Sequence, residues 1–129
     1  MILRNFFKTP AVMMNAHGGK GDIRNVFLYA QDDFETPLRF IIYSELAPGQ
    51  SIGLHQHGQD EEVYVILEGH GHMTVNGQPC PVETGDVLLN KPGWSHSLEN
   101  TSQGTLRLLV FEVGKPISPA PAPSSAHKR

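Results

Sequence analysis

The sequence predicts an all-β protein built as one domain. Apolar residues alternate with polar ones or cluster in short runs, and turn residues recur at roughly the 8–12-residue spacing of β-sandwiches and barrels. Helical periodicity is almost absent along the chain. The length of 129 residues suits a single domain with one modest hydrophobic core.

Eight strands are expected, separated by glycine, proline, asparagine and aspartate. They cover Arg24–Tyr29, Leu38–Leu46, Ser51–His57, Glu62–Glu68, His72–Val75, Asp86–Leu89, His96–Asn100 and Leu106–Glu112. Asn76 and Gly77 predict a tight hairpin, because both residue types tolerate positive φ. Cys80 stands between Pro79 and Pro81, which predicts a loop at that point.

The chain divides by composition into three segments. Residues 1–23 form an N-terminal arm that contains a glycine-rich stretch at 15–21, and residues 24–114 hold all the predicted strands. Residues 115–129 are rich in Pro, Ala and Ser. Such a composition cannot bury enough apolar surface to fold, so we expect a disordered tail there.

Charge and composition exclude several classes of function. The net charge is −3 from ten basic and thirteen acidic residues, and three of the basic ones lie in the tail, which leaves residues 1–114 with seven against thirteen. An acidic domain is not expected to bind nucleic acid. No stretch approaches the ~20 apolar residues that span a bilayer. We therefore expect a cytoplasmic protein without a membrane partner, and its single cysteine, Cys80, suits a reducing compartment.

Three histidines and one glutamate form the candidate functional site of the sequence. His55 and His57 are two residues apart, so on a strand both imidazoles leave the same face. Glu62 begins the next strand after a short turn, and an antiparallel hairpin would return it beside these histidines. His96 opens another strand. Three imidazoles and a carboxylate suit a borderline divalent metal with positions left open for water or substrate.

The spacing of these residues resembles the two sequence motifs of the cupins. The first motif is matched in full by Gly49, His55, His57, Glu62 and Gly69. The second motif is matched in spacing by Gly85, Gly93, His96 and Asn100. One departure is that Lys91 stands where the second motif has proline, and Pro92 follows one position later. The resemblance covers roughly residues 38–112.

The resemblance implies a fold and a cofactor. The fold is the cupin double-stranded β-helix, a jelly-roll barrel, over residues 24–114. The cofactor is one divalent metal ion, which is manganese, iron, nickel, zinc or copper, held by His55, His57, Glu62 and His96. The resemblance to small cupins also implies a homodimer. An extended N-terminal segment can pair with the sheet edge of a second copy.

Alternatives to these assignments remain open in the sequence. Glu61 competes with Glu62 for the carboxylate position, although the interval to the following motif glycine favours Glu62. His70 and His72 are either additional ligands or residues of the surface and pocket edge. His17 caps the site if the glycine-rich arm folds over the barrel mouth, and is solvated if the arm is mobile.

Pocket residues follow from the direction of side chains on each strand. If Glu62 points inward, Tyr64 and Ile66 point inward too. Only one of the neighbours Arg39 and Phe40 can face the interior. The candidates for contact with a substrate are Tyr64, His72 and Trp94, the last in the loop before His96.

The resemblance implies a metal-dependent enzyme that acts on a small oxygenated molecule. The reaction types are those of a dioxygenase, a decarboxylase or other lyase, or a cyclase. Two alternatives come from other classes: a non-catalytic module that binds a small molecule, and a sugar isomerase or epimerase that uses histidine as a base. Cupins share a fold and a metal site but no single reaction.

Overall fold

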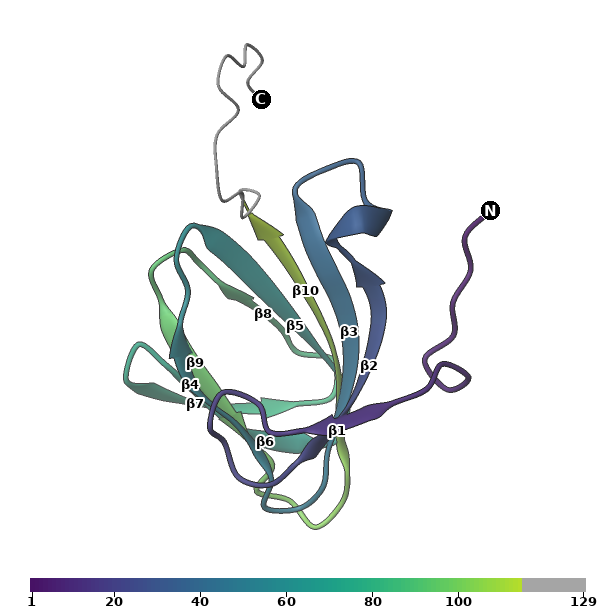
Figure 1. The fold of residues 1–129 in the computed structure, drawn as a ribbon. Coiled ribbons are helices and arrows are strands. Elements are labelled where there is room, and N and C mark those ends of the chain that lie inside the picture. The colour runs from purple at the N-terminus through teal and green to yellow at the C-terminus, as the bar shows by residue number, and fades with distance from the viewer. Residues whose placement is uncertain (115–129) are drawn as a thin grey trace.

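A computed structural model describes residues 1–114 as two antiparallel sheets that face each other (Figure 1). The larger sheet has the strand order β1-β2-β3-β10-β5-β8, and the smaller has the order β4-β9-β6-β7. The elements are β1 (Val12–Met14), β2 (Ile23–Ala30), the 3-10 helix η1 (Gln31–Asp33), β3 (Leu38–Leu46), β4 (Ser51–Gln56), β5 (Asp60–Glu68), β6 (His70–Val75), β7 (Gln78–Glu83), β8 (Val87–Asn90), β9 (Ser95–Glu99) and β10 (Leu106–Gly114). The all-β prediction is confirmed, and the predicted tail at 115–129 lies outside the described residues.

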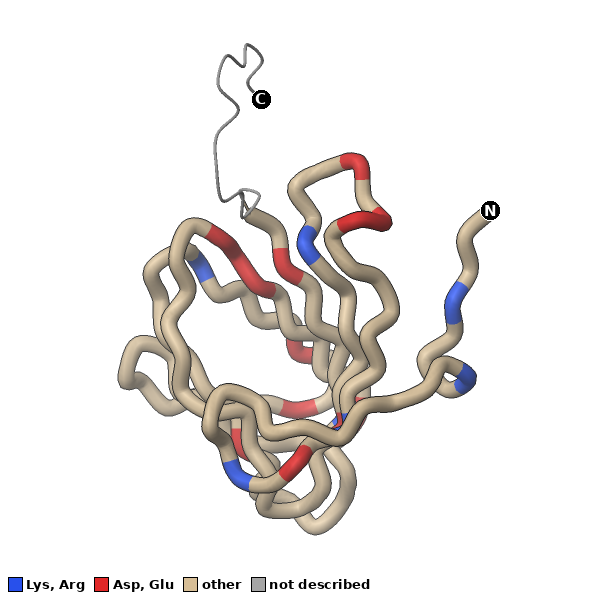
Figure 2. The backbone as a smooth tube through the Cα atoms, in the orientation of Figure 1, with Lys and Arg blue, Asp and Glu red and all other residues tan. Residues whose placement is uncertain are grey.

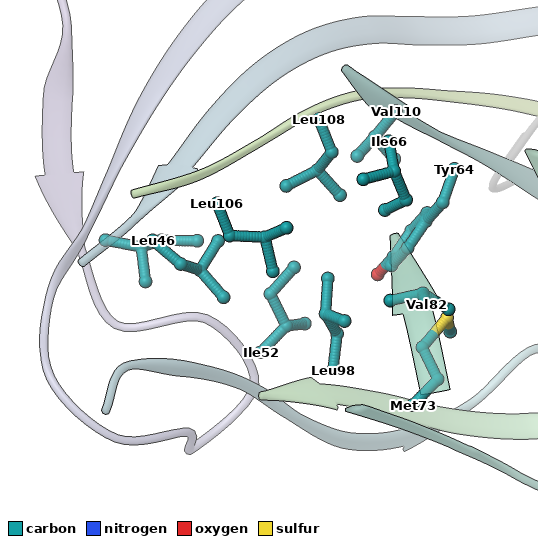
Figure 3. Close-up of a cluster of buried hydrophobic side chains, with 11 residues drawn as sticks. Leu46, Ile52, Tyr64, Ile66, Met73, Val82, Leu98, Leu106, Leu108 and Val110 are labelled. Carbon is teal, nitrogen blue, oxygen red and sulfur yellow. The ribbon is translucent and has the colours of Figure 1, made fainter. Parts of the chain in front are cut away.

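The hydrophobic core lies between the two sheets. Figure 3 shows Leu108 of β10 pointing across the interior toward Ile52 of β4 and Leu98 of β9. These side chains belong to a cluster of buried residues drawn from both sheets, with Leu46, Leu98, Leu106 and Leu108 fully inaccessible to solvent. Burial of this apolar area is the main stabilising term of a barrel of this size.

On β5 and β10 of the larger sheet, the row of inward side chains is apolar at one end of the strand and polar at the other. On β10, Leu106, Leu108, Val110 and Glu112 are all buried, as the alternation of a strand requires. On β5 the buried row runs from Asp60 at the start of the strand through Glu62 and Tyr64 to Ile66. Acidic residues therefore collect at the end of the barrel where β5 begins and β10 ends (Figure 2). The site described below lies at this end.

The N-terminal segment covers the outer face of the larger sheet. Phe6 stacks on Tyr43 of β3 with ring centroids 3.9 Å apart, next to the buried residues Val26 and Leu28 of β2. Arg4 forms an ion pair with Asp33 at 2.9 Å. The arm is therefore held on the barrel through Arg4 and Phe6.

The eight expected strands are present, with ends shifted by at most two residues. Two further strands, β1 and β7, were not expected. The predicted loop around Cys80 is wrong, because Cys80 lies within β7, which pairs with β6. β7 is the edge strand of its sheet, and an edge tolerates Pro79 and Pro81 because one side of the strand needs no N–H donors. Residues 1–114 contain no helix with the length and hydropathy needed to cross a bilayer.

Candidate metal centre

Strands from both sheets bring His55, His57, Glu62 and His96 to one point. His55 lies on β4 opposite its register partner His96 on β9, and His57 follows directly after β4. Glu62 lies on β5 of the larger sheet. His57, Glu62 and His96 are buried, with exposed fractions of 8%, 6% and 0%. The structure therefore assembles all four predicted ligands at the polar end of the core.

The donor atoms of these residues converge on a small volume. Glu62 Oε1 lies 3.0 Å from His57 Nε2, 3.1 Å from His96 Nε2 and 3.7 Å from His55 Nε2. The Nε2 atoms of His57 and His96 are 2.9 Å apart. Two ligand atoms held about 2.1 Å from one ion at right angles lie about 3.0 Å apart. The spacing of the four residues therefore fits a single ion.

Hydrogen bonds on the far side of two rings fix their tautomers. His57 Nδ1 lies 2.8 Å from Asp60 Oδ2, and His55 Nδ1 lies 2.8 Å from the carbonyl oxygen of Gly53. A carbonyl or carboxylate oxygen accepts the hydrogen bond, so Nδ1 carries the proton in both rings. When the ring is neutral, the Nε2 lone pair then faces Glu62. This is the arrangement that orients imidazoles as metal ligands.

One buried oxygen of the site has no hydrogen-bond partner. Glu62 Oε1 is buried, and although three imidazole nitrogens surround it, none of the described residues is aligned to donate a hydrogen bond to it. A buried carboxylate oxygen without a partner is costly. A divalent cation among the four donor atoms removes that cost, so the residues present fit a metal.

The electrostatics of the cluster favour an ionised glutamate beside a protonated histidine. Burial acts to raise the pKa of Glu62, but the three neighbouring imidazoles hold it far below its usual range. The Glu62 carboxylate raises the pKa of His57 to about 9, against the effect of burial and with a further contribution from Asp60. Burial lowers the pKa of His96. In the metal-free protein the ring of His57 therefore carries an additional proton, and a positive charge, near neutral pH.

A second group of charged residues lies on the Nδ1 side of the His57 ring, away from Glu62. Besides Asp60, Glu112 Oε1 lies 3.9 Å from His57 Nδ1, and Arg39 Nη1 lies 3.1 Å from Glu112 Oε2. Burial, followed by the charge of Glu62, raises the pKa of Glu112 to about 7. These residues hold the ring of His57 in place and balance part of its charge.

A cavity of about 270 Å³ reaches Glu62 from the larger sheet and the arm. Its lining consists of Met14, Asn15, Ala16, His17, Ile23, Asn25, Phe27, Phe40, Ile42, Ser44, Ile52, Glu62, Tyr64 and Val110. Tyr64 is 2% exposed, and its hydroxyl forms no hydrogen bond with any residue in the described part of the chain. Figure 3 shows that this hydroxyl points into the interior between the sheets. The cavity thus offers room for a small molecule next to the four-residue cluster.

The glycine-rich arm is fixed over the site. The ring of His17 stacks on that of His55, with centroids 3.7 Å apart and planes inclined by 12°. The N–H of Gly53 donates to the carbonyl of Ala16 at 2.9 Å. A Cβ atom on Gly53 would overlap the His17 carbonyl, and one on Gly19 would overlap the Ser51 carbonyl. Of the two sequence interpretations, the structure has the arm folded over the barrel mouth.

Known proteins share the sequence pattern of this chain. Residues 42–112 match the family profile described as the cupin domain. The chain is a cupin. The oxalate-binding protein of Thermotoga maritima is 37% identical to it over 113 residues, which make up 88% of this chain and 93% of that one. A tetracenomycin polyketide synthase protein of Streptomyces glaucescens is 32% identical over 82 residues, or 64% of this chain and 54% of that one.

A solved structure shows the same fold. The crystal structure described as a predicted oxalate decarboxylase from Thermotoga maritima superposes on this cupin with a TM-score of 0.85 and 32% identity. The superposition covers 89% of this chain and 100% of that one. The jelly-roll barrel expected from the two sequence motifs is confirmed.

Of the remaining sequence candidates, Phe40 and Tyr64 line the cavity of this cupin and the others do not. His70 and His72 are exposed on β6, and Trp94 is 37% exposed in the loop before β9. Glu61 is half-buried and is not part of the cluster that Glu62 joins. Phe40 lines the cavity and its neighbour Arg39 does not. Tyr64 is therefore the pocket candidate that the structure places beside the site.

Besides Asp60, two buried polar residues near the site are not predicted from the sequence. Glu112 continues the inward row of β10 as its only charged member, and that break in an apolar row could have identified it. Asn90 is the register partner of Glu62 on β8, and both atoms of its buried amide lack a partner among residues 1–114. No motif in the sequence points to Asn90.

Proposed function

We propose that this cupin holds one divalent metal ion through His55, His57, Glu62 and His96, and binds a small chelating acid there. The observation that carries the proposal is the convergence of three Nε2 atoms on the unpartnered, buried oxygen of Glu62. This convergence lies at the wall of a cavity large enough for a ligand. A barrel needs no such inward cluster of polar groups merely to fold.

The residues of the chain act by position. Asp60 and the Gly53 carbonyl hold the rings of His57 and His55 with Nε2 toward the site. Glu62 contributes the single negative charge among the four. When bound, a divalent ion supplies a Lewis-acidic positive charge with open positions for the oxygens of an acid. The buried hydroxyl of Tyr64 is available to donate a hydrogen bond to the bound acid.

The identity of the metal stays open in this proposal. Manganese, iron, nickel, zinc and copper all accept imidazole and carboxylate ligands. The name of the T. maritima relative, an oxalate-binding protein, supports a small acid as the ligand. Oxalate is therefore the first probe to use.

The test is calorimetric titration of oxalate into metal-loaded and chelator-stripped protein. We expect binding to the loaded protein and none to the stripped protein, because no Lys or Arg of residues 1–114 lines the cavity and the charge of His57 is already paired with Asp60 and Glu62. Equal binding to both forms, or no binding to the loaded form, would contradict the proposal.

A catalytic role is a further part of the proposal. Decarboxylation is the reaction favoured by the T. maritima structure, which is described as a predicted oxalate decarboxylase. Release of carbon dioxide from oxalate by the loaded protein would support it, while consumption of dioxygen would favour a dioxygenase. If both are absent and oxalate still binds, the protein is a binding module.

Two sequence predictions stay predictions. The first is a homodimer, which sedimentation at micromolar concentration tests; a monomer alone would refute it. The second is a cytoplasmic location, which fractionation of the source cells tests.

A further inference from the structure

We infer that the acid bound by this cupin carries an apolar body of a few carbon atoms behind its chelating head. Branched 2-oxo acids are one such class of molecule. The inference rests on the proposed function and names the ligand class for the same site. It follows from the charge, the shape and the size of the cavity.

The charges of the cavity do not suit a ligand with a second carboxylate away from the metal. Glu62 is the one ionisable carboxylate in the lining, and no Lys or Arg contributes to it within residues 1–114. Oxalate can place both of its carboxylates on one metal ion, but a longer dianion would extend its second carboxylate into the cavity, where no cation faces it, and an unpaired charge in such a place is costly. A ligand with one charged head avoids this cost.

The walls of the cavity form an apolar row that leads away from the site. Tyr64 on β5 pairs in register with Val110 on β10, Val110 pairs with Ile42 on β3, and Ile42 pairs with Phe27 on β2. All four residues line the cavity. Neighbouring strands are about 4.8 Å apart, so this row extends for about 14 Å.

The two ends of this apolar row differ in their exposure to solvent. Tyr64, at the end nearest Glu62, is 2% exposed, whereas Phe27 at the other end is 47% exposed. A ligand that places its polar head at Glu62 therefore lays its body along Val110 and Ile42 toward the more open end. Ile23, Phe40 and Ile52 complete the apolar walls.

The size of the cavity agrees with a ligand larger than oxalate. A volume of about 270 Å³ corresponds to about nine water molecules at ~30 Å³ each. Oxalate at the metal would leave the apolar part of this volume unfilled. A branched body of a few carbons would fill it and remove the walls from water.

The test compares two acids with the same head. Pyruvate and 4-methyl-2-oxopentanoate share the 2-oxocarboxylate group, and the second adds an isopropyl group. Calorimetry uses the protein loaded with Zn²⁺, which has no redox chemistry. Each buried carbon contributes roughly fourfold in affinity, so we expect 4-methyl-2-oxopentanoate to bind about 50-fold more tightly than pyruvate.

Two adjacent isoleucines provide a matched pair of variants. Ile42 lines the cavity, while Ile41, on the opposite face of β3, packs beside Val26 and Tyr43. Ile42→Thr should reduce the preference for 4-methyl-2-oxopentanoate over pyruvate several-fold. Ile41→Thr places the same substitution on the same strand and should preserve the preference.

Each outcome separates this inference from the proposed function. Pyruvate or oxalate binding as tightly as 4-methyl-2-oxopentanoate would overturn the inference and leave the proposed function intact. An equal loss of preference in both isoleucine variants would also overturn it. Failure of all three acids to bind the loaded protein would overturn the proposed function itself.

Discussion

At the scale of single residues, the site depends on where protons and lone pairs lie. Three imidazoles share one carboxylate oxygen, and the hydrogen bonds to Asp60 and Gly53 direct two of them. The sequence predicted all four residues of this cluster from their spacing. It could not predict the supporting contacts, because Asp60 reads as an ordinary turn residue and Glu112 lies some fifty residues further along the chain.

Metal binding should release about one proton at pH 7. The pKa of His57 is about 9 in the metal-free protein, so its ring is protonated at pH 7 and must lose that proton to bind an ion. Metal affinity therefore falls as the pH falls below about 9, by about tenfold per pH unit. Calorimetry in two buffers with different ionisation enthalpies measures the released proton. Affinity that is constant between pH 6 and pH 8 would contradict the proton assignment.

Replacement of His57 by alanine should abolish retention of the metal while the barrel stays folded. The substitution removes one of four donor atoms, and it also removes the cation that pairs with the buried Glu62 carboxylate. Metal per chain and the circular dichroism spectrum are the two measurements. His72→Ala is the control, because His72 is exposed on β6, and it should retain the metal. Equal metal content in the two variants would show that His57 is not a ligand.

Asp60 should act as a positioning residue for His57. Asp60→Ala removes the acceptor of the Nδ1 hydrogen bond, and loss of such a support lowers metal affinity by roughly 10–100-fold. Asp60→Asn keeps an oxygen acceptor and should recover a large part of the affinity. Competition with a chelator of known affinity measures both variants. An alanine variant with unchanged affinity would rule out this role.

At the scale of elements, the alternation of apolar and polar residues predicted the strands well. It could not predict contacts between residues far apart in the sequence. The inward rows of β5 and β10 follow directly from their sequence pattern. β7 was missed because Pro79 and Pro81 are typical of loops, and only its place at a sheet edge makes a strand possible. The position of the arm depends on a contact between residues 15–21 and β4 that no local pattern encodes.

The close approach of the arm to β4 should make Gly19 intolerant of a side chain. A Cβ atom there would overlap the Ser51 carbonyl, and overpacking of this kind costs about 1–3 kcal/mol of unfolding free energy. Gly104→Ala is the control, because a Cβ atom at Gly104 meets nothing within 4 Å. Urea denaturation measures both variants. Equal stability of the two would mean that the arm does not rest on β4.

At the scale of the whole molecule, the proposed metal ion links the two sheets. His55 and His96 belong to the smaller sheet and Glu62 to the larger one. The cupin motifs predicted this architecture, since their ligands come from strands that lie far apart in the sequence. The sequence did not predict the apolar walls of the cavity, because they are assembled from β2, β3, β5 and β10 together.

Removal of the metal should therefore lower the thermal stability of the whole barrel. A ligand at a hundred times its dissociation constant stabilises the folded state by about 2.7 kcal/mol. We expect the melting temperature to fall by several degrees on chelation and to recover on reloading. The His57→Ala variant should show no such dependence. If neither chelator nor metal changes the melting temperature of the wild-type protein, a metal link between the sheets is contradicted.

The central claim is tested most directly by elemental analysis of the purified protein, kept free of chelators, with the metal counted per chain. The arrangement of His55, His57, Glu62 and His96 predicts close to one ion of manganese, iron, nickel, zinc or copper per chain. Absence of metal, even after reloading with each of these ions, would contradict the claim.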